Sequence, residues 1–221
     1  AFITPSEFLK KKLSLNGFEE KRIHCIPTFT ASKTTIGKQQ IGSYGLYFGR
    51  VTEEKGVETV IKAYEKLPEY TVKIMGDDTT DEAKRLKKYV ENHKMKNVEF
   101  LGFKSGAELE NVIKGARFTL IPSIWYDNLP NTALESFQYS KPVIASNIGS
   151  LPELVIDGEN GYLFKPSNVE DLIKKIKMLD DDTLVKKMGQ ASRKRLESRF
   201  APQTHYEDLM KIFNEAVKSR K

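Results

Sequence analysis

The chain has 221 residues, of which 30% are charged and 39% hydrophobic, and its net charge is +6. This composition is ordinary for a globular domain, and no apolar run approaches the ~18 residues of a membrane-spanning helix. The single cysteine, Cys25, excludes an internal disulfide and fits a reducing compartment such as the cytoplasm. The positive charge favours anionic partners, namely phosphates, nucleic acids or acidic lipid surfaces, without choosing among them.

The first 42 residues differ in pattern from the rest of the chain. Ser6 is suited to cap a short helix that begins after Pro5, and the apolar run 22–29 predicts a strand ended by Pro27. Residues 30–42 are polar and aperiodic, which indicates a linker. The chain starts without methionine in the middle of this pattern, and no basic segment precedes an apolar one. We therefore expect no secretory signal and a piece cut from a longer protein.

From residue 44 onward, short apolar segments alternate with amphipathic ones. The apolar segments predict strands at 44–49, 70–76, 97–102, 117–123, 141–146 and 161–164. The amphipathic segments predict helices at 56–67, 81–94, 106–116, 130–140, 150–155, 169–179, 182–200 and 201–213. This alternation is typical of βαβ units, and strands that are apolar throughout are covered on both faces. The sequence therefore predicts an α/β fold with a doubly wound parallel sheet.

The loop after the first of these strands carries two cationic side chains between two glycines. In a parallel sheet of this kind, ligands bind outside the carboxyl ends of the strands. Arg50 and Lys55 would stand there, between Gly49 and Gly56, and a guanidinium fork with an ammonium group suits a diphosphate. A solvated loop with surface charges is an equal alternative. Neither G-x-x-x-x-G-K-[ST] nor G-x-G-x-x-G occurs, so an ATPase or an NAD enzyme is not the first hypothesis.

The stretch WYDNLPNTALESF, residues 125–137, places two carboxylates eight positions apart around a predicted helix start. Pro130 suits the first helical position, with Asn128 or Leu129 as the cap. Asp127 could accept hydrogen bonds from sugar hydroxyls, and Glu135 from a ribose diol. The alternative is that Asp127 caps the helix and Glu135 is a surface acid.

The same helix start offers backbone donors. The first-turn N–H groups around Asn131, Thr132 and Ala133 have no partner within a helix, so they could receive a phosphate or a sugar oxygen. The loop 147–151 after the next strand could be a simple connector or a wall of the same pocket.

Together these motifs resemble a known family. They occur in its order and spacing: Gly49-Arg50 with Lys55-Gly56, Gly76, FLGF at 100–103, Pro122-Ser123, Asp127-x7-Glu135, Lys141-Pro142-Val143, GSLPELV at 149–155 and DGENGYLF at 157–164. The set resembles the C-terminal, donor-binding domain of the retaining glycosyltransferases of family 4, the glycosyl transferases group 1, which have the GT-B fold. The likeness covers roughly residues 44 to 175 and is weaker on both sides.

The resemblance implies a division of the chain. Residues 1–42 would be the end of an N-terminal domain and the interdomain linker. Residues 43–199 would form the Rossmann-like domain that binds the nucleotide sugar, and residues 200–221 a C-terminal helix.

It also implies roles for individual residues. The family pairs two acids in an E-x7-E motif, so Glu135 would hold the ribose and Asp127 would contact the transferred hexose. Arg50 and Lys55 would steady the diphosphate and stabilise the leaving nucleotide. Asp127 departs from the pattern, because the family usually has the longer Glu there. The donor-binding set implied in addition is Gly49, Gly76, Phe103, Lys104, Leu129, Pro130, Asn131, Thr132 and Leu134. In it the backbone of Phe103 and Lys104 would contact the base, and Leu134 would pack on the nucleoside.

The implied activity is transfer of a hexosyl group from a nucleotide diphosphate sugar, with UDP or GDP as the nucleotide, to a glycan or lipid-linked acceptor in polysaccharide biosynthesis. Retention at the anomeric carbon and the absence of a metal cofactor belong to the same expectation. The three histidines show no metal-ligand spacing. The acceptor would bind to the N-terminal domain, so we expect the chain to be inactive alone.

Other functions stay open at this point. A sugar-nucleotide epimerase or hydrolase of the same fold would share the nucleotide pocket, and so would a non-catalytic nucleotide-binding module. The basic run 186–199 could bind nucleic acid or an acidic membrane face. Its apolar positions keep a helical period, however, which favours a packed helix with a solvated basic side and no nucleic-acid partner. Weak contact with the inner face of a membrane would still suit a transferase that acts on a lipid-linked acceptor.

Overall fold

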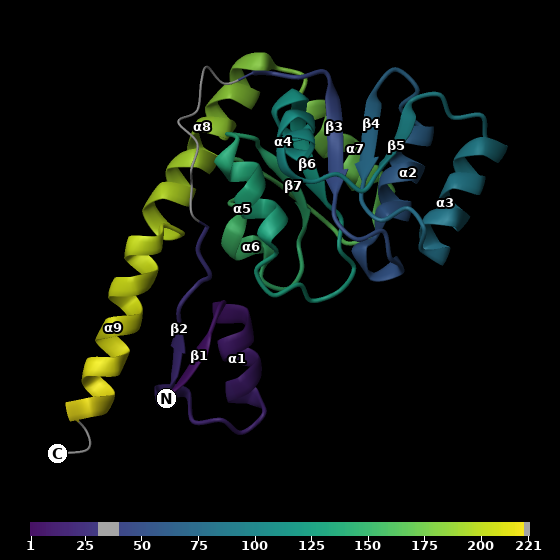
Figure 1. The fold of residues 1–221 in the computed structure, drawn as a ribbon. Coiled ribbons are helices and arrows are strands. Elements are labelled where there is room, and N and C mark those ends of the chain that lie inside the picture. Colours follow the sequence, from purple (N-terminus) through teal and green to yellow (C-terminus); the bar gives the residue numbers. More distant parts are fainter. Residues whose placement is uncertain (31–39, 219–221) are drawn as a thin grey trace.

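A parallel six-stranded sheet forms the centre of the computed structural model, which describes residues 1–30 and 40–218 (Figure 1). Its strands are β3 (Tyr44–Phe48), β4 (Thr71–Met75), β5 (Val98–Gly102), β6 (Ala116–Ile121), β7 (Val143–Ser146) and β8 (Gly161–Phe164). They are arranged in the order β5-β4-β3-β6-β7-β8, and every pairing between neighbours is parallel. The predicted doubly wound α/β fold is confirmed.

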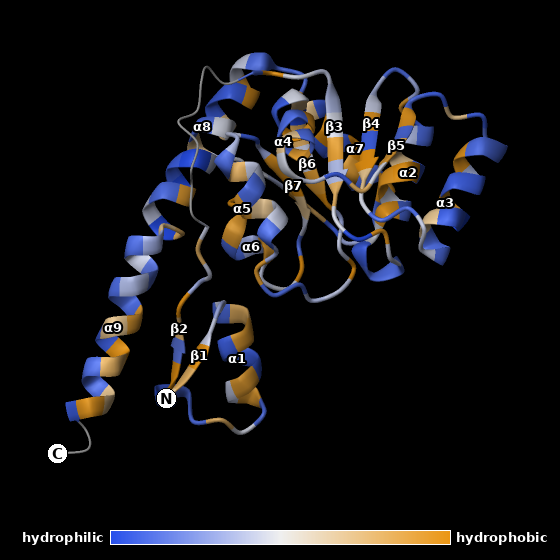
Figure 2. Ribbon diagram, viewed as in Figure 1, coloured by the Kyte–Doolittle hydropathy of each residue, from blue (hydrophilic) through white to orange (hydrophobic). Residues whose placement is uncertain are grey.

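Helices cover both faces of the sheet. On one face lie α2 (Val57–Glu65), α3 (Asp81–Asn92) and α7 (Val169–Met178), and on the other α4 (Gly106–Gly115), α5 (Asn131–Gln138) and α6 (Leu151–Leu154). Side chains alternate accordingly: Leu46 and Phe48 of β3 point into the cluster with α4, whereas Tyr47 joins the cluster with α2. The strands therefore carry hydrophobic residues on both sides (Figure 2).

The long helix α8 (Asp182–Arg199) belongs to the packed core. Its Met188 joins the apolar cluster on one face of the sheet and its Leu196 the cluster on the other, and both side chains are buried. The expectation that this basic run is a packed helix is confirmed.

The order of the strands fixes where a crevice opens. From β3 the chain moves outward to β4 and β5, and from β6 it moves outward in the other direction to β7 and β8. The loops that follow β3 and β6 therefore diverge, and the space between them is where sheets of this type hold their ligands.

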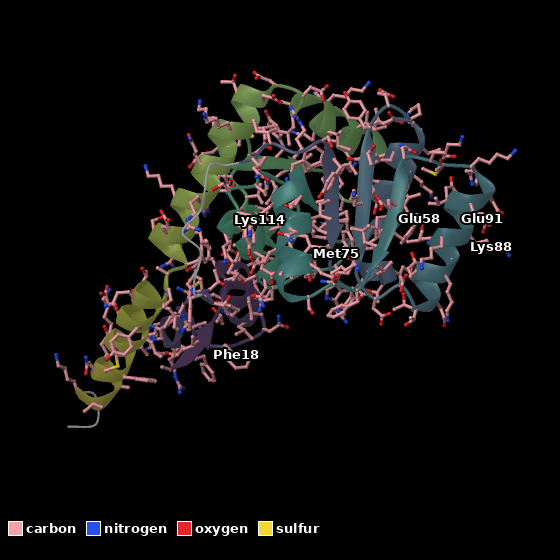
Figure 3. All side chains as sticks on the ribbon, turned by 45° about the horizontal axis from the view of Figure 1, so that its top comes forward. Phe18, Glu58, Met75, Lys88, Glu91 and Lys114 are labelled. Carbon is pink, nitrogen blue, oxygen red and sulfur yellow. The ribbon has the colours of Figure 1, made fainter. Side chains whose placement is uncertain are left out.

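The N-terminal residues form a separate small unit beside the sheet domain. It contains β1 (Phe2–Thr4), α1 (Glu7–Leu15), a 3₁₀ turn (Glu20–Arg22) and β2 (Ile23–Cys25), and β1 pairs with β2 in parallel. Phe18 lies on this unit, away from the sheet (Figure 3). The last helix, α9 (Pro202–Lys218), contacts the irregular segment that follows β2, since the ring N–H of His205 donates to the Pro27 carbonyl at 2.8 Å.

Several predictions for this unit can be compared with the structure. Ser6 caps α1 as expected, because its side chain accepts from the Leu9 N–H. The predicted strand at 22–29 is shorter, ending at Cys25, and β1 was not predicted because three residues are too few to show a period. Residues 31–39 of the predicted linker lie outside the described residues.

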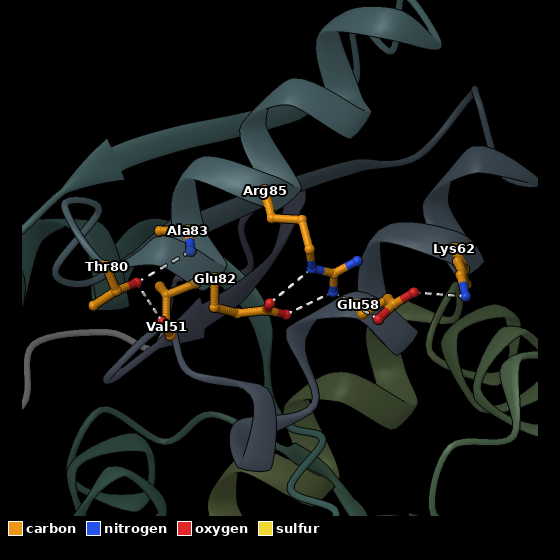
Figure 4. Close-up of polar contacts among 7 residues, drawn as sticks. All are labelled: Val51, Glu58, Lys62, Thr80, Glu82, Ala83 and Arg85. Atoms are coloured by element: carbon orange, nitrogen blue, oxygen red, sulfur yellow. Dashed lines mark hydrogen bonds and ion pairs between the residues drawn. The ribbon is translucent and has the colours of Figure 1, made fainter.

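The loop after β3 is held by α3. The Thr80 hydroxyl caps α3 by accepting from the Ala83 N–H at 3.1 Å, and it donates to the Val51 carbonyl at 2.6 Å (Figure 4). Nearby, Arg85 of α3 binds Glu82 and also Glu58 of α2, so the two helices are joined at the surface. The start of the loop that carries Arg50 is therefore anchored.

A buried lysine, Lys141, lies at the amino-terminal end of the strands, opposite the end where the crevice opens. The Lys141 side chain is 2% exposed, and its Nζ donates at 2.7 Å to each of three carbonyls, those of Gln40, Lys114 and Ala116. Burial lowers the pKa of Lys141 to about 8, so the ammonium form with its three N–H groups prevails at pH 7. Lys141 thereby ties the segment entering β3 to α4 and β6.

We expect Lys141→Met to destabilise the fold, because the three carbonyls would stay buried without a donor. A cost of about 1–3 kcal/mol is expected in the free energy of unfolding, measured by urea titration at pH 7. Lys62→Met is the matched control, since Lys62 is half-exposed and binds only the surface residue Glu58. A control change within about 0.5 kcal/mol is expected. Equal effects of the two substitutions would contradict this role of Lys141.

Candidate functional site

Two hollows adjoin at the carboxyl ends of β3 and β6. The first, about 230 Å³, is lined by Tyr47, Phe48, Gly49, Arg50, Lys55, Leu120, Ile121, Ser123, Asp127, Asn128, Pro130, Asn131 and Thr132. The second, about 330 Å³, is lined by Phe48, Gly49, Arg50, Met75, Gly76, Asp77, Phe103, Lys104, Leu109, Thr132 and Glu135. Four residues line both, so the two hollows share a wall. Together they contain eleven of the thirteen residues predicted for the site: Arg50, Lys55, Asp127, Glu135, Gly49, Gly76, Phe103, Lys104, Pro130, Asn131 and Thr132.

Two glycines let the backbone approach closely enough to shape these hollows. A Cβ on Gly76 would lie 1.9 Å from the carbonyl oxygen of Gly49, so the ends of β3 and β4 can meet only without a side chain there. Gly56 has φ +67°, and its Cβ would lie 2.1 Å from the Pro122 carbonyl oxygen. It follows a 3₁₀ turn, Glu53–Lys55, and starts α2, which places Lys55 at the first hollow.

An ion pair crosses the first hollow. Lys55 Nζ lies 2.5 Å from Asp127 Oδ1, and the two side chains are only 19% and 13% exposed. The second carboxylate oxygen of Asp127 accepts a hydrogen bond from the Ser123 hydroxyl. Removing one partner of so sheltered a pair leaves an unpaired charge, which is costly. The Asp127 carboxylate thus holds Lys55 in place and does not cap a helix.

The start of α5 differs by one position from the prediction. Pro130 is itself the N-cap, and the helix begins at Asn131, whereas the sequence predicted Pro130 at the first helical position after a cap at 128 or 129. Proline has no side-chain acceptor, so this helix start has no side-chain cap. Among the described residues, Ala133 N–H donates to the Pro130 carbonyl, while the N–H groups of Asn131 and Thr132 have no acceptor. The positive end of α5 therefore faces the first hollow with two open donors.

The turn before α5 is strained. Leu129 has φ +59°, a left-handed conformation that a branched residue rarely adopts. Its N–H donates to the Ser150 hydroxyl at 2.7 Å, and its side chain is 5% exposed. The apolar cluster beneath α5 contains both Leu129 and Leu134, so neither side chain lines a hollow. This placement differs from the expected packing of Leu134 on a nucleoside, because α5 turns that position toward β7.

Arg50 stands at the mouth where the two hollows meet. Its side chain is 72% exposed, and its guanidinium lies 3.7 Å from Glu54 Oε1, an interaction of little strength at a solvated surface. A guanidinium in this position is available for a bidentate contact with an anion that spans both hollows.

Glu135 supplies the second hollow with a carboxylate. The side chain is half-buried, and it forms no hydrogen bond or ion pair with any residue that the structure describes. Burial raises the pKa of Glu135. A sheltered carboxylate of this kind is satisfied by a ligand that brings hydroxyl donors, such as a vicinal diol.

Apolar side chains form much of the rest of the second hollow, together with Asp77 and Lys104. Met75 and Leu109 contribute apolar side chains, and Phe103 stands at the rim with its ring 74% exposed. Lys104 also lines this hollow, and its Nζ lies 3.5 Å from Glu108 Oε2. An aromatic or heterocyclic group is the kind of ligand that this surface can accept.

Two side chains of the site had no predicted role, although Ser123 belongs to one of the motifs quoted above. Tyr47 lines the first hollow and donates its hydroxyl to the Arg50 carbonyl, while burial, with Asp127 nearby, raises its pKa. Ser123 binds Asp127 as described above. Tyr47 lies next to the last residue of β3, and Ser123 follows β6, so both are near the carboxyl ends of strands. That position was the only indication of a role in the sequence, and serine and tyrosine are too common there to predict one.

The fold and the site together define a Rossmann-like domain whose two adjoining hollows offer cationic, carboxylate and apolar groups at the carboxyl ends of the strands. The model of the family described as Glycosyl transferases group 1 matches residues 32–195. The chain therefore belongs to the glycosyl transferases group 1.

Among curated relatives, an uncharacterized glycosyltransferase of Methanocaldococcus jannaschii is 30% identical over 174 residues, which is 78% of this chain and 48% of that protein. The glycogen synthase of Mycobacterium tuberculosis is 31% identical over 186 residues, 80% of this chain and 42% of that protein. The chain thus spans about half the length of the curated relatives it matches.

Solved structures share the fold. A glycosyltransferase from Rickettsia africae superposes with a TM-score of 0.88 at 21% identity, over 98% of this chain and 63% of that chain. Anabaena HepE, crystallised with UDP and glucose, gives a TM-score of 0.84 at 20% identity, over 96% and 62%. The sheet and its helices are those of GT-B glycosyltransferases.

Over residues 1–30 and 40–218, no group of three His, Cys, Asp or Glu side chains is arranged to hold a metal ion. In the same part of the chain, none of the helices has the length and apolar character needed to cross a membrane.

We expect Glu135→Gln to raise the melting temperature by a few degrees at pH 7 to 8, because it removes a sheltered carboxylate that has no partner. Since the folded pKa is raised above the unfolded value, the acid stabilises the fold below about pH 4 and this contribution is lost as the pH rises through the folded pKa. The gain of the variant should therefore shrink toward zero near about pH 4.

Calorimetry across this pH range measures the effect. Glu108→Gln is the control, because Glu108 is exposed and pairs only with Lys104. A gain that is equal for both variants, or independent of pH, would contradict the assignment of Glu135 as an unpartnered acid.

Proposed function

We propose that this chain is the donor-binding domain of a retaining glycosyltransferase of family 4, which transfers a hexosyl group from a nucleotide diphosphate sugar. One observation carries the proposal: two adjoining hollows hold cationic groups with open backbone donors on one side and, on the other, beside an apolar rim, an acid that has no partner among the described residues. A nucleotide sugar has the matching groups in the same order, namely sugar, diphosphate, ribose and base.

The proposed placement of the donor follows from these groups. The diphosphate lies between Arg50, Lys55 and the first turn of α5, which stabilise negative charge as the nucleotide leaves. Glu135 accepts from the ribose hydroxyls, and the base lies against the rim near Phe103. The hexose occupies the first hollow beside Asp127.

Asp127 receives a narrower role than the resemblance implied. Both of its oxygens are engaged by Lys55 and Ser123, so a sugar hydroxyl must share the carboxylate with them. We therefore propose that Asp127 contacts the hexose while orienting Lys55 toward the diphosphate.

The remaining elements of the proposal concern the whole protein. We propose that the reaction retains the configuration at the anomeric carbon, needs no metal ion and uses a glycan or lipid-linked acceptor. We place the acceptor site on a preceding domain and the protein in the cytoplasm, with weak contact at the inner face of the membrane. UDP is the first nucleotide to test, because Anabaena HepE and the Staphylococcus aureus protein TarM were crystallised with it.

Calorimetric titration of the chain with UDP, GDP and ADP tests the donor site. We expect saturable binding of one nucleotide, weakened about 10- to 100-fold by Arg50→Ala and by Glu135→Ala, because each removes a hydrogen bond that involves a charge. Glu170→Ala, which alters an exposed acid of α7, should bind like the unmodified chain.

Two results would contradict the proposal. One is the absence of saturable binding at millimolar nucleotide in both this chain and a version extended by its preceding residues. The other is binding that neither Arg50→Ala nor Glu135→Ala weakens, which would place the nucleotide elsewhere. Nucleotide binding with release of free sugar, or with epimerised donor, in the extended protein would favour a hydrolase or an epimerase of the same fold.

We also expect that this 221-residue chain binds donor without transferring sugar, since the acceptor site is proposed to lie outside it. Incubation with radiolabelled nucleotide sugar and candidate acceptors should leave the label on the donor. Any labelled glycan formed by the chain alone would contradict the assignment of the acceptor site to another domain.

A further inference from the structure

Glu153, the acidic residue of α6, binds the N-terminal unit. The Glu153 carboxylate accepts from the backbone N–H of Glu7 at 2.9 Å and from that of Phe8 at 2.6 Å. These N–H groups belong to the first turn of α1, where the helix dipole adds to the attraction for a negative charge. A side chain from the sheet domain therefore satisfies a helix start that is more than 140 residues distant along the chain.

Ser6 extends this contact to the loop that carries Asp127. Its hydroxyl caps α1 by accepting from Leu9 N–H at 3.1 Å, and it donates to Asn128 Oδ1 at 2.7 Å. Ser6 is fully buried, so water does not compete for either bond. The residue next to Asp127 is thus bound to the cap of α1.

Helix α6 binds the same loop directly. The hydroxyl of Ser150, the residue that precedes α6, donates to the Asp127 carbonyl and accepts from Leu129 N–H, each at 2.7 Å. Ser150 and Glu153 lie at the same end of the sheet domain. The contacts therefore close a ring that runs from Glu153 to α1, from Ser6 to Asn128, and back through Ser150.

Aromatic contacts between α1 and the loop accompany these hydrogen bonds. The rings of Phe8 and Tyr126 are 5.1 Å apart, and Lys12 Nζ lies 5.0 Å from the centre of the Tyr126 ring. Tyr126 precedes Asp127 and Asn128 follows it, so both neighbours of Asp127 contact the α1 region.

We propose that Glu153 and Ser6 are positioning residues, which dock α1 on the sheet domain so that the loop 125–130 holds Asp127 against Lys55. The loop has no regular structure and contains the strained Leu129, so contacts from outside must maintain its conformation. A shift of the N-terminal unit would consequently change the pocket. This consequence for donor binding rests on the proposed function, whereas the coupling between α1 and the loop does not.

Hydrogen exchange measured by mass spectrometry tests the coupling without any ligand. In Glu153→Ala, exchange should accelerate about tenfold across residues 7–9, because the N–H groups of Glu7 and Phe8 lose their acceptor, and also at residues 126–129. Glu153→Gln keeps one acceptor oxygen and should give a smaller change at both segments. Glu170→Gln, an exposed acid of α7, should change neither. Circular dichroism spectra equal to that of the unmodified chain establish that the variants are folded.

Trp125 provides a second, spectroscopic readout. It is the only tryptophan in the sequence, it is 64% exposed, and it lies in the loop. The fast component of its fluorescence anisotropy decay should about double in amplitude in Glu153→Ala and in Ser6→Ala, because the loop loses its support on nanosecond timescales. A purely structural role of Glu153 in capping α1 would leave this signal unchanged.

The outcomes separate the two proposals. Faster exchange at 7–9 with unchanged exchange at 126–129 and unchanged anisotropy overturns the coupling, and so does unchanged exchange at 7–9. If the unmodified chain binds UDP, Glu153→Ala should weaken binding about fivefold, in line with the usual size of coupling between sites. Unaltered affinity despite a loosened loop would overturn the positioning role. Failure of both the unmodified chain and its extended version to bind any nucleotide would count against the proposed function and leave the exchange result standing.

Discussion

The neighbouring carboxyl ends of β3 and β6 determine where this domain can act. All six strands of the described sheet are parallel, and the chain leaves these two in opposite directions, so their loops separate and a crevice opens between them. The residues with a proposed role in donor binding stand on the loops around this crevice and on α5, where Glu135 lies beyond the first turn. On one side of the crevice, the backbones of Gly49 and Gly76 lie too close together to admit a side chain at Gly76. On the other side, the positive end of α5 faces the crevice.

The two acids of the pocket are in opposite states. Asp127 is engaged on both oxygens, by Lys55 and by Ser123, whereas Glu135 has no partner among the described residues. A paired acid stabilises the arrangement of its neighbours, and an unpaired one costs stability until a ligand supplies donors. The proposed donor site therefore combines a prearranged cationic end with an acid whose hydrogen bonds are still to be made.

The N-terminal unit would connect this pocket to the preceding domain that the proposed function includes. Glu153 and Ser6 join α1 to the loop of Asp127 through hydrogen bonds of 2.6–2.9 Å, and α9 contacts the same unit at Pro27. A preceding domain attached to this unit would move α1 when it moves. The geometry thus provides a physical route by which acceptor binding on another domain would affect the donor pocket.

The sequence by itself determined the fold class, the strand and helix order from residue 44 and most of the pocket residues. It could do so because apolar periodicity and glycine spacing are local properties, and because parallel strands bring their carboxyl ends to one edge. Tertiary structure alone decided the pairing of Lys55 with Asp127, the burial of Leu134 in the core and the cap that Glu153 provides for α1. Each of these depends on contacts between residues more than 60 positions apart or on the direction of a side chain, and neither leaves a local pattern in one sequence.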